Sequence, residues 1–258
     1  MKKSAIFLSL LFHFSCANRT VEIDLSTINL PIVLEKARKA EKSVKSVKGL
    51  ASVRIESPER NLSFNQVTIV KEPNFLRLEA LAPFGRTAAM VISDGAMVYV
   101  ITPHEQEVFD GLREFDFSFF YPELPVRISV TDLVNLLLGR LPVMPNFDES
   151  QVLISKGSSN IILAFLDENG GQNSLWVNPF TYRVEKAKIA LDDGTVVTCR
   201  FKNFKEVGNG VSFPTKVELR VKDFSISINY RDEVEVNRDI EQNLFKQAPS
   251  LVRFEKKF

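Results

Sequence analysis

The sequence contains little of the chemistry that enzymes use most often. Its 258 residues include only two cysteines and two histidines, and 33 basic residues are balanced by 32 acidic ones. The small net charge excludes the strongly basic composition of a typical nucleic-acid binder, so we expect no nucleic-acid partner. A hydrophobic content of 45% also excludes a disordered chain, which needs few apolar residues and a large net charge.

Catalytic and metal-binding motifs are missing as well. His104 is the only histidine after the N-terminal segment, and it lies in the turn-like sequence Thr102-Pro103-His104-Glu105. A histidine-based metal site or a Ser-His-acid triad would depend on this one residue. No HExxH, paired CxxC, GxGxxG or P-loop pattern occurs, and acidic pairs such as Asp192-Asp193 and Asp232-Glu233 lie in turns and polar segments. We therefore expect no enzymatic activity, no metal and no cofactor.

Phenylalanine is the residue type in excess, with 21 Phe beside four Tyr and one Trp. Because Phe has no polar group, this excess predicts either much buried aromatic surface or a surface that contacts apolar molecules. The densest aromatic run spans residues 115–121. It is predicted to plug one end of the fold, and lining a cavity entrance is the alternative.

The N-terminus resembles a bacterial lipoprotein signal. Lys2 and Lys3 precede an apolar run over residues 5–14, which is too short to cross a bilayer as a helix, and Ser15 then precedes Cys16. The resemblance implies a signal peptide over residues 1–15, lipidation such as palmitate on Cys16 and a tether over residues 16–29. His13 and Phe14 depart from the usual pattern, and an ordinary signal peptide is the alternative.

Two consequences follow from a lipidated Cys16. Ala17 after the cysteine implies, by analogy with enteric lipoproteins, an outer-membrane location with the protein facing the periplasm. Cys199 is then a lone thiol, and its strand-like surroundings over residues 196–201 predict a buried structural residue rather than a nucleophile.

Two segments have helical patterns. Apolar residues recur at helical spacing over residues 30–47, which predicts one amphipathic helix. In the second segment Ser129 is a candidate N-cap with Asp132 three residues later, and an apolar run leads to Gly139 and Pro142. Residues 234–245 are expected to end in a third, short helix.

Most of the other segments are short strand-like runs separated by turn residues. The predicted strands are residues 50–55, 62–70, 75–81, 87–92, 97–101, 107–111, 151–155, 161–166, 175–177, 183–191, 196–204, 216–221 and 224–230. The connections among the first five strands are too short for parallel crossovers, so these strands are expected to form an antiparallel meander.

These elements predict a β-dominated α+β fold. The simplest arrangement is an antiparallel sheet curled into an unclosed half-barrel, with helices covering its apolar concave face. No linker or repeat divides the chain, so we expect a single domain over residues 30–245, followed by a tail over residues 246–258. We expect a monomer.

A predicted turn carries the clearest family resemblance. Pro83, Phe84 and Gly85 join the strands at 75–81 and 87–92, and they resemble the Pro-Leu-Gly turn of the LolB family in the LolA/LolB superfamily of lipoprotein carriers. In that family the Leu projects and is associated with inserting cargo lipid into the membrane. Residues 125–141 and 184–230 resemble later family segments. The resemblance implies that the tip over residues 83–85 projects and contacts lipid.

The resemblance also implies an apolar cavity for acyl chains. Candidate lining residues are one alternating face of several strands together with two leucines of the second helix as a lid: Leu76, Leu78, Met90, Ile92, Val98, Val100, Leu133, Leu137, Leu163 and Phe165. The sequence leaves open whether each lines a cavity or packs as plain core, and which face is concave.

The function implied is that of a lipid-anchored acceptor. It would receive acylated lipoprotein cargo from a LolA-like periplasmic carrier and insert the cargo into the outer membrane, without covalent chemistry. The alternative is a structural or regulatory periplasmic lipoprotein that uses the same fold to bind a protein partner.

Overall fold

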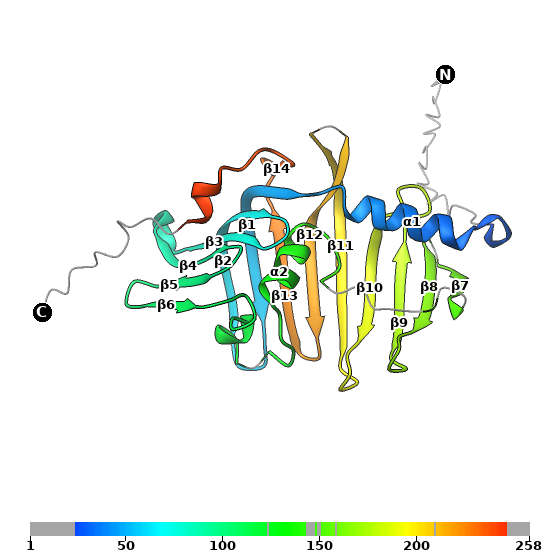
Figure 1. Cartoon of the computed structure of the whole chain (residues 1–258), viewed down its shortest axis with the longest axis horizontal. Helices are drawn as coiled ribbons and strands as arrows, with labels where there is room; N and C mark the ends of the chain where they lie inside the picture. Colours follow the sequence, from blue (N-terminus) through cyan, green and yellow to red (C-terminus); the bar gives the residue numbers. More distant parts are fainter. Residues whose placement is uncertain are drawn as a thin grey trace, which may run out of the picture.

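The computed structural model describes residues 24–122, 124–142, 148, 151–157, 159–208 and 210–246. Its strands form one antiparallel sheet with the order β6-β5-β4-β3-β2-β1-β13-β12-β11-β10-β9-β8-β7, and β14 pairs with the start of β1 (Figure 1). The edge strands β6 and β7 do not pair with each other, so the half-barrel is open. The predicted fold class is confirmed.

The predicted bounds of three strands, at residues 75–81, 161–166 and 224–230, are those of the structure. The strands are β1 (Ser46–Glu56), β2 (Asn61–Lys71), β3 (Phe75–Leu81), β4 (Thr87–Asp94), β5 (Val98–Ile101), β6 (Gln106–Phe109), β7 (Leu153–Lys156), β8 (Ile161–Leu166), β9 (Gln172–Val177), β10 (Val184–Ala190), β11 (Val196–Val207), β12 (Val211–Val221), β13 (Phe224–Tyr230) and β14 (Glu235–Val236). The expected short helix near residue 245 is η5 (Gln242–Phe245), a 3-10 helix.

The first helix ends earlier than predicted. α1 spans Leu30–Glu41, with the Asn29 side chain accepting from the Ile32 N–H, and Lys42 is its C-cap. Val44 and Val47 continue the helical spacing and are buried, but Val47 already lies in β1, where it pairs with Val70. Two apolar residues three apart fit a helix and a strand start equally well. The pairing with β2 decides between them.

The helices cover one face of the sheet. α1 lies across the β8–β10 half, and α2 (Val130–Leu137) lies nearer the centre, close to β2 and β3 (Figure 1). Their apolar residues join alternate residues of nearly every long strand in one large hydrophobic core. This shared core makes the helix side the concave face.

The aromatic run closes one end of the core, as a plug does. Phe115 and Tyr121 are buried, and Phe117 belongs to the 3-10 helix η3 (Phe117–Phe119). The Tyr121 ring centroid lies 5.8 Å from that of Phe224, at the start of β13. The Arg60 guanidinium, from the β1–β2 turn, donates a 2.7 Å hydrogen bond to the Phe120 carbonyl and faces the Tyr121 ring.

Candidate functional site

Helix α2 is the element that covers the middle of the concave face. Ser129 and Asp132 form a capping box: the Asp132 N–H donates to the Ser129 hydroxyl, and the Ser129 N–H donates to the Asp132 carboxylate. The helix is amphipathic: Thr131, Asp132 and Asn135 share one side, and the remaining residues are apolar and buried. The apolar side of such a helix has to be covered by other elements.

The C-terminal end of α2 fits closely against β12. The Arg140 N–H donates to the Asn135 carbonyl and the Gly139 N–H to the Leu136 carbonyl, which is the Schellman pattern. Gly139 has φ +72°, and a Cβ atom there would lie 2.5 Å from Pro214 of β12. Glycine is therefore required both by the backbone conformation and by the close approach.

Two polar side chains, those of Tyr230 and Arg140, fix the same end of the helix. The Tyr230 hydroxyl, on β13, donates a 3.1 Å hydrogen bond to the Leu137 carbonyl. Arg140, just after the helix, donates to the carbonyls of Glu41 and Val44 and to the Glu72 carboxylate, at 2.7 Å for the last. α2 is thus tied to the end of α1 and the start of β1.

Glu41 is the titratable group in this junction. Burial of its carboxyl group raises the pKa of Glu41 from 4.5 to about 7, although the Leu141 N–H and the guanidinium groups of Arg140 and Arg183 partly oppose the rise. Arg183 is itself buried and donates a 2.7 Å hydrogen bond to the Ser43 hydroxyl. The charge of Glu41 therefore depends on pH near neutrality.

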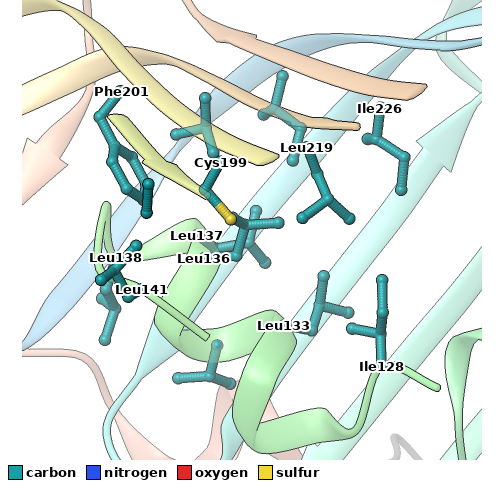
Figure 2. Close-up of a cluster of buried hydrophobic side chains, with 14 of the residues drawn as sticks. Ile128, Leu133, Leu136, Leu137, Leu138, Leu141, Cys199, Phe201, Leu219 and Ile226 are labelled. Carbon is teal, nitrogen blue, oxygen red and sulfur yellow. The ribbon is translucent and has the colours of Figure 1, made fainter. Parts of the chain in front are cut away.

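An apolar cleft lies between α2 and strands β10 to β12. Its volume is about 70 Å³, and its walls include Leu136, Ile189, Val197, Cys199 and Leu219. Figure 2 shows Cys199 and Leu219 on their strands, with the cysteine sulfur directed at the leucines of α2. Binding pockets for small molecules usually hold about 300 Å³ or more. The concave face is therefore nearly filled by its own side chains.

The apolar cleft adjoins a wider, open cleft of about 690 Å³. The two share Val126, Arg127, Ile189 and Leu191, and the outer one is bordered by acidic residues of the β8–β9 and β10–β11 turns: Asp167, Glu168, Asp192 and Asp193. The concave face thus has an apolar interior and a largely acidic mouth.

The predicted lining residues are all buried, but they do not share one face. Leu76, Leu78, Val98, Val100, Leu133, Leu137, Leu163 and Phe165 belong to the concave core. None of the ten predicted residues lines the apolar cleft, and the residues that do were missed. The sequence of β10 to β12 shows alternating apolar and polar residues, but this pattern does not show which of these strands lie under α2.

Met90 and Ile92 were assigned to the wrong face. Leu78 pairs with Val91, so Val91 points into the concave core, whereas Met90 and Ile92 point to the convex face and pack with Ile101. Every residue from 90 to 92 is apolar, so alternation could not separate the two faces. The segment with η5 contacts the convex side of β3 and β4 and makes that face apolar too.

Phe84 lies at the tip of the β3–β4 turn and is fully exposed. It has φ 66° and ψ 18°, and Gly85 has φ 77°, so both residues are left-handed. The Ala82 N–H donates to the Arg86 carbonyl and the Gly85 N–H to the Ala82 carbonyl, which closes the turn. The side chain therefore stands in solvent on a well-defined turn, while its role in lipid transfer stays a prediction.

The tip and the mouth lie at the same edge of the sheet. Neighbouring strands alternate in direction from β3 to β8, so the β3–β4, β10–β11 and β8–β9 turns all fall on one edge. Phe180, in the β9–β10 turn at the opposite edge, is also exposed. It provides a matched position for testing what is particular to Phe84.

The structure also places His104 and Cys199. His104 is exposed in the β5–β6 turn. Cys199 is buried, as predicted, and burial raises the pKa of its thiol to about 12, so the thiol stays protonated at neutral pH. Cys16, the predicted signal peptide and all but the first residue of the predicted tail lie outside the described residues.

No group of three or more His, Cys, Asp or Glu side chains among the described residues is placed to hold a metal ion. No helix among them has both the length and the apolar composition to cross a bilayer.

Comparison with solved structures identifies the fold. A LolA superfamily protein from Nitrosomonas europaea superposes with a TM-score of 0.56 at 16% identity, over 85% of this chain and 98% of that chain. The chain has a LolA-like fold. A DUF1329 family protein from Desulfovibrio piger shares this LolA-like fold, with a TM-score of 0.57 at 12% identity, over 84% of this chain and 97% of that one. No protein-family model and no curated protein matches the sequence.

Proposed function

We propose that this protein is a lipid-anchored carrier that receives acylated lipoproteins and inserts them into the outer membrane. In this proposal residues 1–15 are a signal peptide, Cys16 bears the anchor and the LolA-like domain faces the periplasm. The observation that carries the proposal is the pairing of an apolar concave face under a helical lid with a fully exposed Phe84 at the same edge of the sheet. No covalent chemistry is required.

The cleft of about 70 Å³ is too small for an acyl chain, so cargo binding requires α2 to move away from β10 to β12. The free energy for this movement comes from the cargo. Burying about ten methylenes contributes roughly 8 kcal/mol, which is enough to offset the loss of several side-chain contacts of α2. In this proposal the packing of α2 against β10 to β12 is the closed form of the carrier.

The mouth and the tip have separate roles in the proposal. The acidic border formed by Asp167, Glu168, Asp192 and Asp193 suits a LolA-like donor whose contact surface is basic. Phe84 enters the headgroup region of the target membrane and lowers the cost of moving the acyl chains from the cleft to the bilayer.

The proposal is tested by following a fluorescent acylated lipopeptide from solution to vesicles. The full chain with Cys16→Ser, which removes the anchor, is expected to bind the lipopeptide and then release it to vesicles. With Phe84→Glu, binding is expected to persist and delivery to fall. Phe180→Glu is the control and is expected to leave both steps unchanged. A chain that neither binds nor transfers the lipopeptide contradicts the proposal.

A second candidate function is favoured by the nearly filled core. A lipoprotein of this fold that binds a protein partner needs no cavity, and the cleft of about 70 Å³ fits that role without any movement of α2. The same assay separates the two functions, because a partner-binding scaffold does not take up the lipopeptide at any concentration at which the chain stays folded.

A further inference from the structure

The convex face of the sheet carries a concentration of positive charge. A shallow cleft of about 360 Å³ crosses β1 and β10 to β13, bounded by Arg54, Lys188, Arg200, Lys202, Lys216 and Arg220, which we call the basic face. Only two acids, Glu56 and Glu218, share this cleft, leaving an excess of four positive charges. In the whole chain, basic and acidic residues nearly balance, so the charge is segregated rather than abundant.

Strand pairing arranges these residues in rows across the sheet. One row consists of Lys188, Thr198, Arg220, Ser225 and Glu56. The next row consists of Lys186, Arg200, Glu218, Ser227 and Arg54. Alternate residues of the same strands, such as Cys199 and Leu219, enter the concave core, so both rows point away from the helices. Serine and threonine separate the long basic side chains and leave room for the cleft.

The charge of the basic face is largely uncompensated. Glu218 accepts hydrogen bonds from Lys202 and Lys216, each at 2.8 Å. Within the described ranges no acid forms an ion pair with Arg54, Arg200 or Arg220. Lys186 lies directly opposite Arg200, and Lys202 lies directly opposite Lys216. Like charges directly opposite each other destabilise a sheet, so these two pairs cost the folded protein free energy. An anionic partner would remove that cost.

The basic face continues into an apolar border. Lys186 pairs with Trp176 of β9, and its ammonium group lies 4.0 Å from the ring centroid. Ile162 pairs with Trp176 in the same row, while Leu153 of β7 ends the other row and is 73% exposed. Basic residues next to Trp and exposed aliphatic residues are typical of proteins that lie on anionic membranes.

We propose that the basic face and its apolar border lie against an anionic phospholipid surface. The cations contact lipid phosphates, and Trp176 and Leu153 lie at the headgroup level beside them. An acidic protein segment would satisfy the cations but would leave the exposed leucine without a partner. The proposal does not depend on acyl-chain carriage, because it concerns the opposite face of the sheet and is measured without cargo.

The test is co-sedimentation of the full chain with vesicles, in a Cys16→Ser background so that no acyl anchor contributes. Vesicles containing phosphatidylglycerol are expected to bind the chain at low salt and to release it near 1 M salt, where charges are screened beyond about 3 Å. Arg200→Gln with Arg220→Gln is expected to weaken this binding about 30-fold, since each basic residue near an anionic surface strengthens binding about fivefold.

The matched control is Lys39→Gln with Lys42→Gln, two exposed positions at the end of α1, and it is expected to leave vesicle binding unchanged. If the Arg200 and Arg220 variant unfolds, Arg54→Gln with Lys188→Gln tests the same face. Equal binding to phosphatidylcholine vesicles, or binding that survives both neutralising pairs, would overturn the proposal. Salt-sensitive binding of polyglutamate without vesicle binding would assign the face to an acidic protein and also overturn it.

Discussion

Phe84 has a backbone conformation that few phenylalanines adopt. A left-handed residue with a Cβ atom costs about 1 kcal/mol, and here no packing of the exposed ring offsets the cost. Strain of this kind, at a residue that contributes nothing to the core, is what the proposed role of Phe84 in lipid delivery leads us to expect. The sequence located the tip correctly, because Pro and Gly beside the Phe are strong turn residues.

Substitutions of Phe84 separate the effect of backbone strain on stability from the effect of the side chain on lipid delivery. Phe84→Asn is expected to leave the free energy of unfolding unchanged or raise it by up to about 1 kcal/mol, because Asn tolerates the left-handed conformation. Delivery of the lipopeptide to vesicles is expected to fall, and Phe84→Leu is expected to retain it. Denaturant titration measures the first effect and vesicle transfer the second. Normal delivery by Phe84→Asn would show that the apolar tip is dispensable.

Glu41 makes stability depend on pH. An acid whose pKa is about 7 in the folded chain and near 4.5 in the unfolded chain holds its proton more tightly when folded. Its contribution to the free energy of unfolding is therefore greatest below pH 4.5 and declines as the pH rises to 7, by about 3 kcal/mol. Glu41→Gln is expected to lose this decline, as measured by denaturant titration across that range. Glu35→Gln, at an exposed position of α1, should keep it, and an unchanged profile in Glu41→Gln would contradict the assignment.

At the scale of elements, α2 is the helix that covers the middle of the concave face. Its start was predictable because capping residues act locally: Ser129 and Asp132 bond to each other across one turn. Its docking was not predictable, because the partners of its last turn, Tyr230 and Pro214, are 93 and 75 residues away in the sequence. Local signals define where the helix forms, and distant residues define where it lies.

A covalent lock tests whether α2 must move. Leu136→Cys places a second thiol in the apolar cleft, toward which the Cys199 sulfur is directed (Figure 2). In the Cys16→Ser background, oxidation to a disulfide is expected to abolish lipopeptide binding, and reduction is expected to restore it. Leu136→Ser, treated identically, should not respond to oxidant. Undiminished binding by the oxidised chain, with the disulfide verified by mass spectrometry, would exclude α2 as the lid.

At the scale of the whole molecule, one antiparallel sheet separates the chain's chemistry between two faces. The concave face collects apolar residues under α1 and α2, and its mouth is acidic. The convex face collects the cations of β1 and β10 to β13. A nearly neutral composition therefore contains two oppositely charged regions, which the total charge does not show.

The amino-acid sequence was sufficient for the properties that arise between near neighbours. Alternation predicted the strands, short connections predicted antiparallel pairing, and local capping and turn residues predicted α2 and the tip at Phe84. Which residues meet on each face depends on the strand order and on the curl of the sheet. Alternating apolar and polar residues define two faces of a sheet without showing which face is concave. For that reason Val91 rather than Met90 points into the core, and Arg54, Lys188 and Arg220, far apart in the chain, meet on one face.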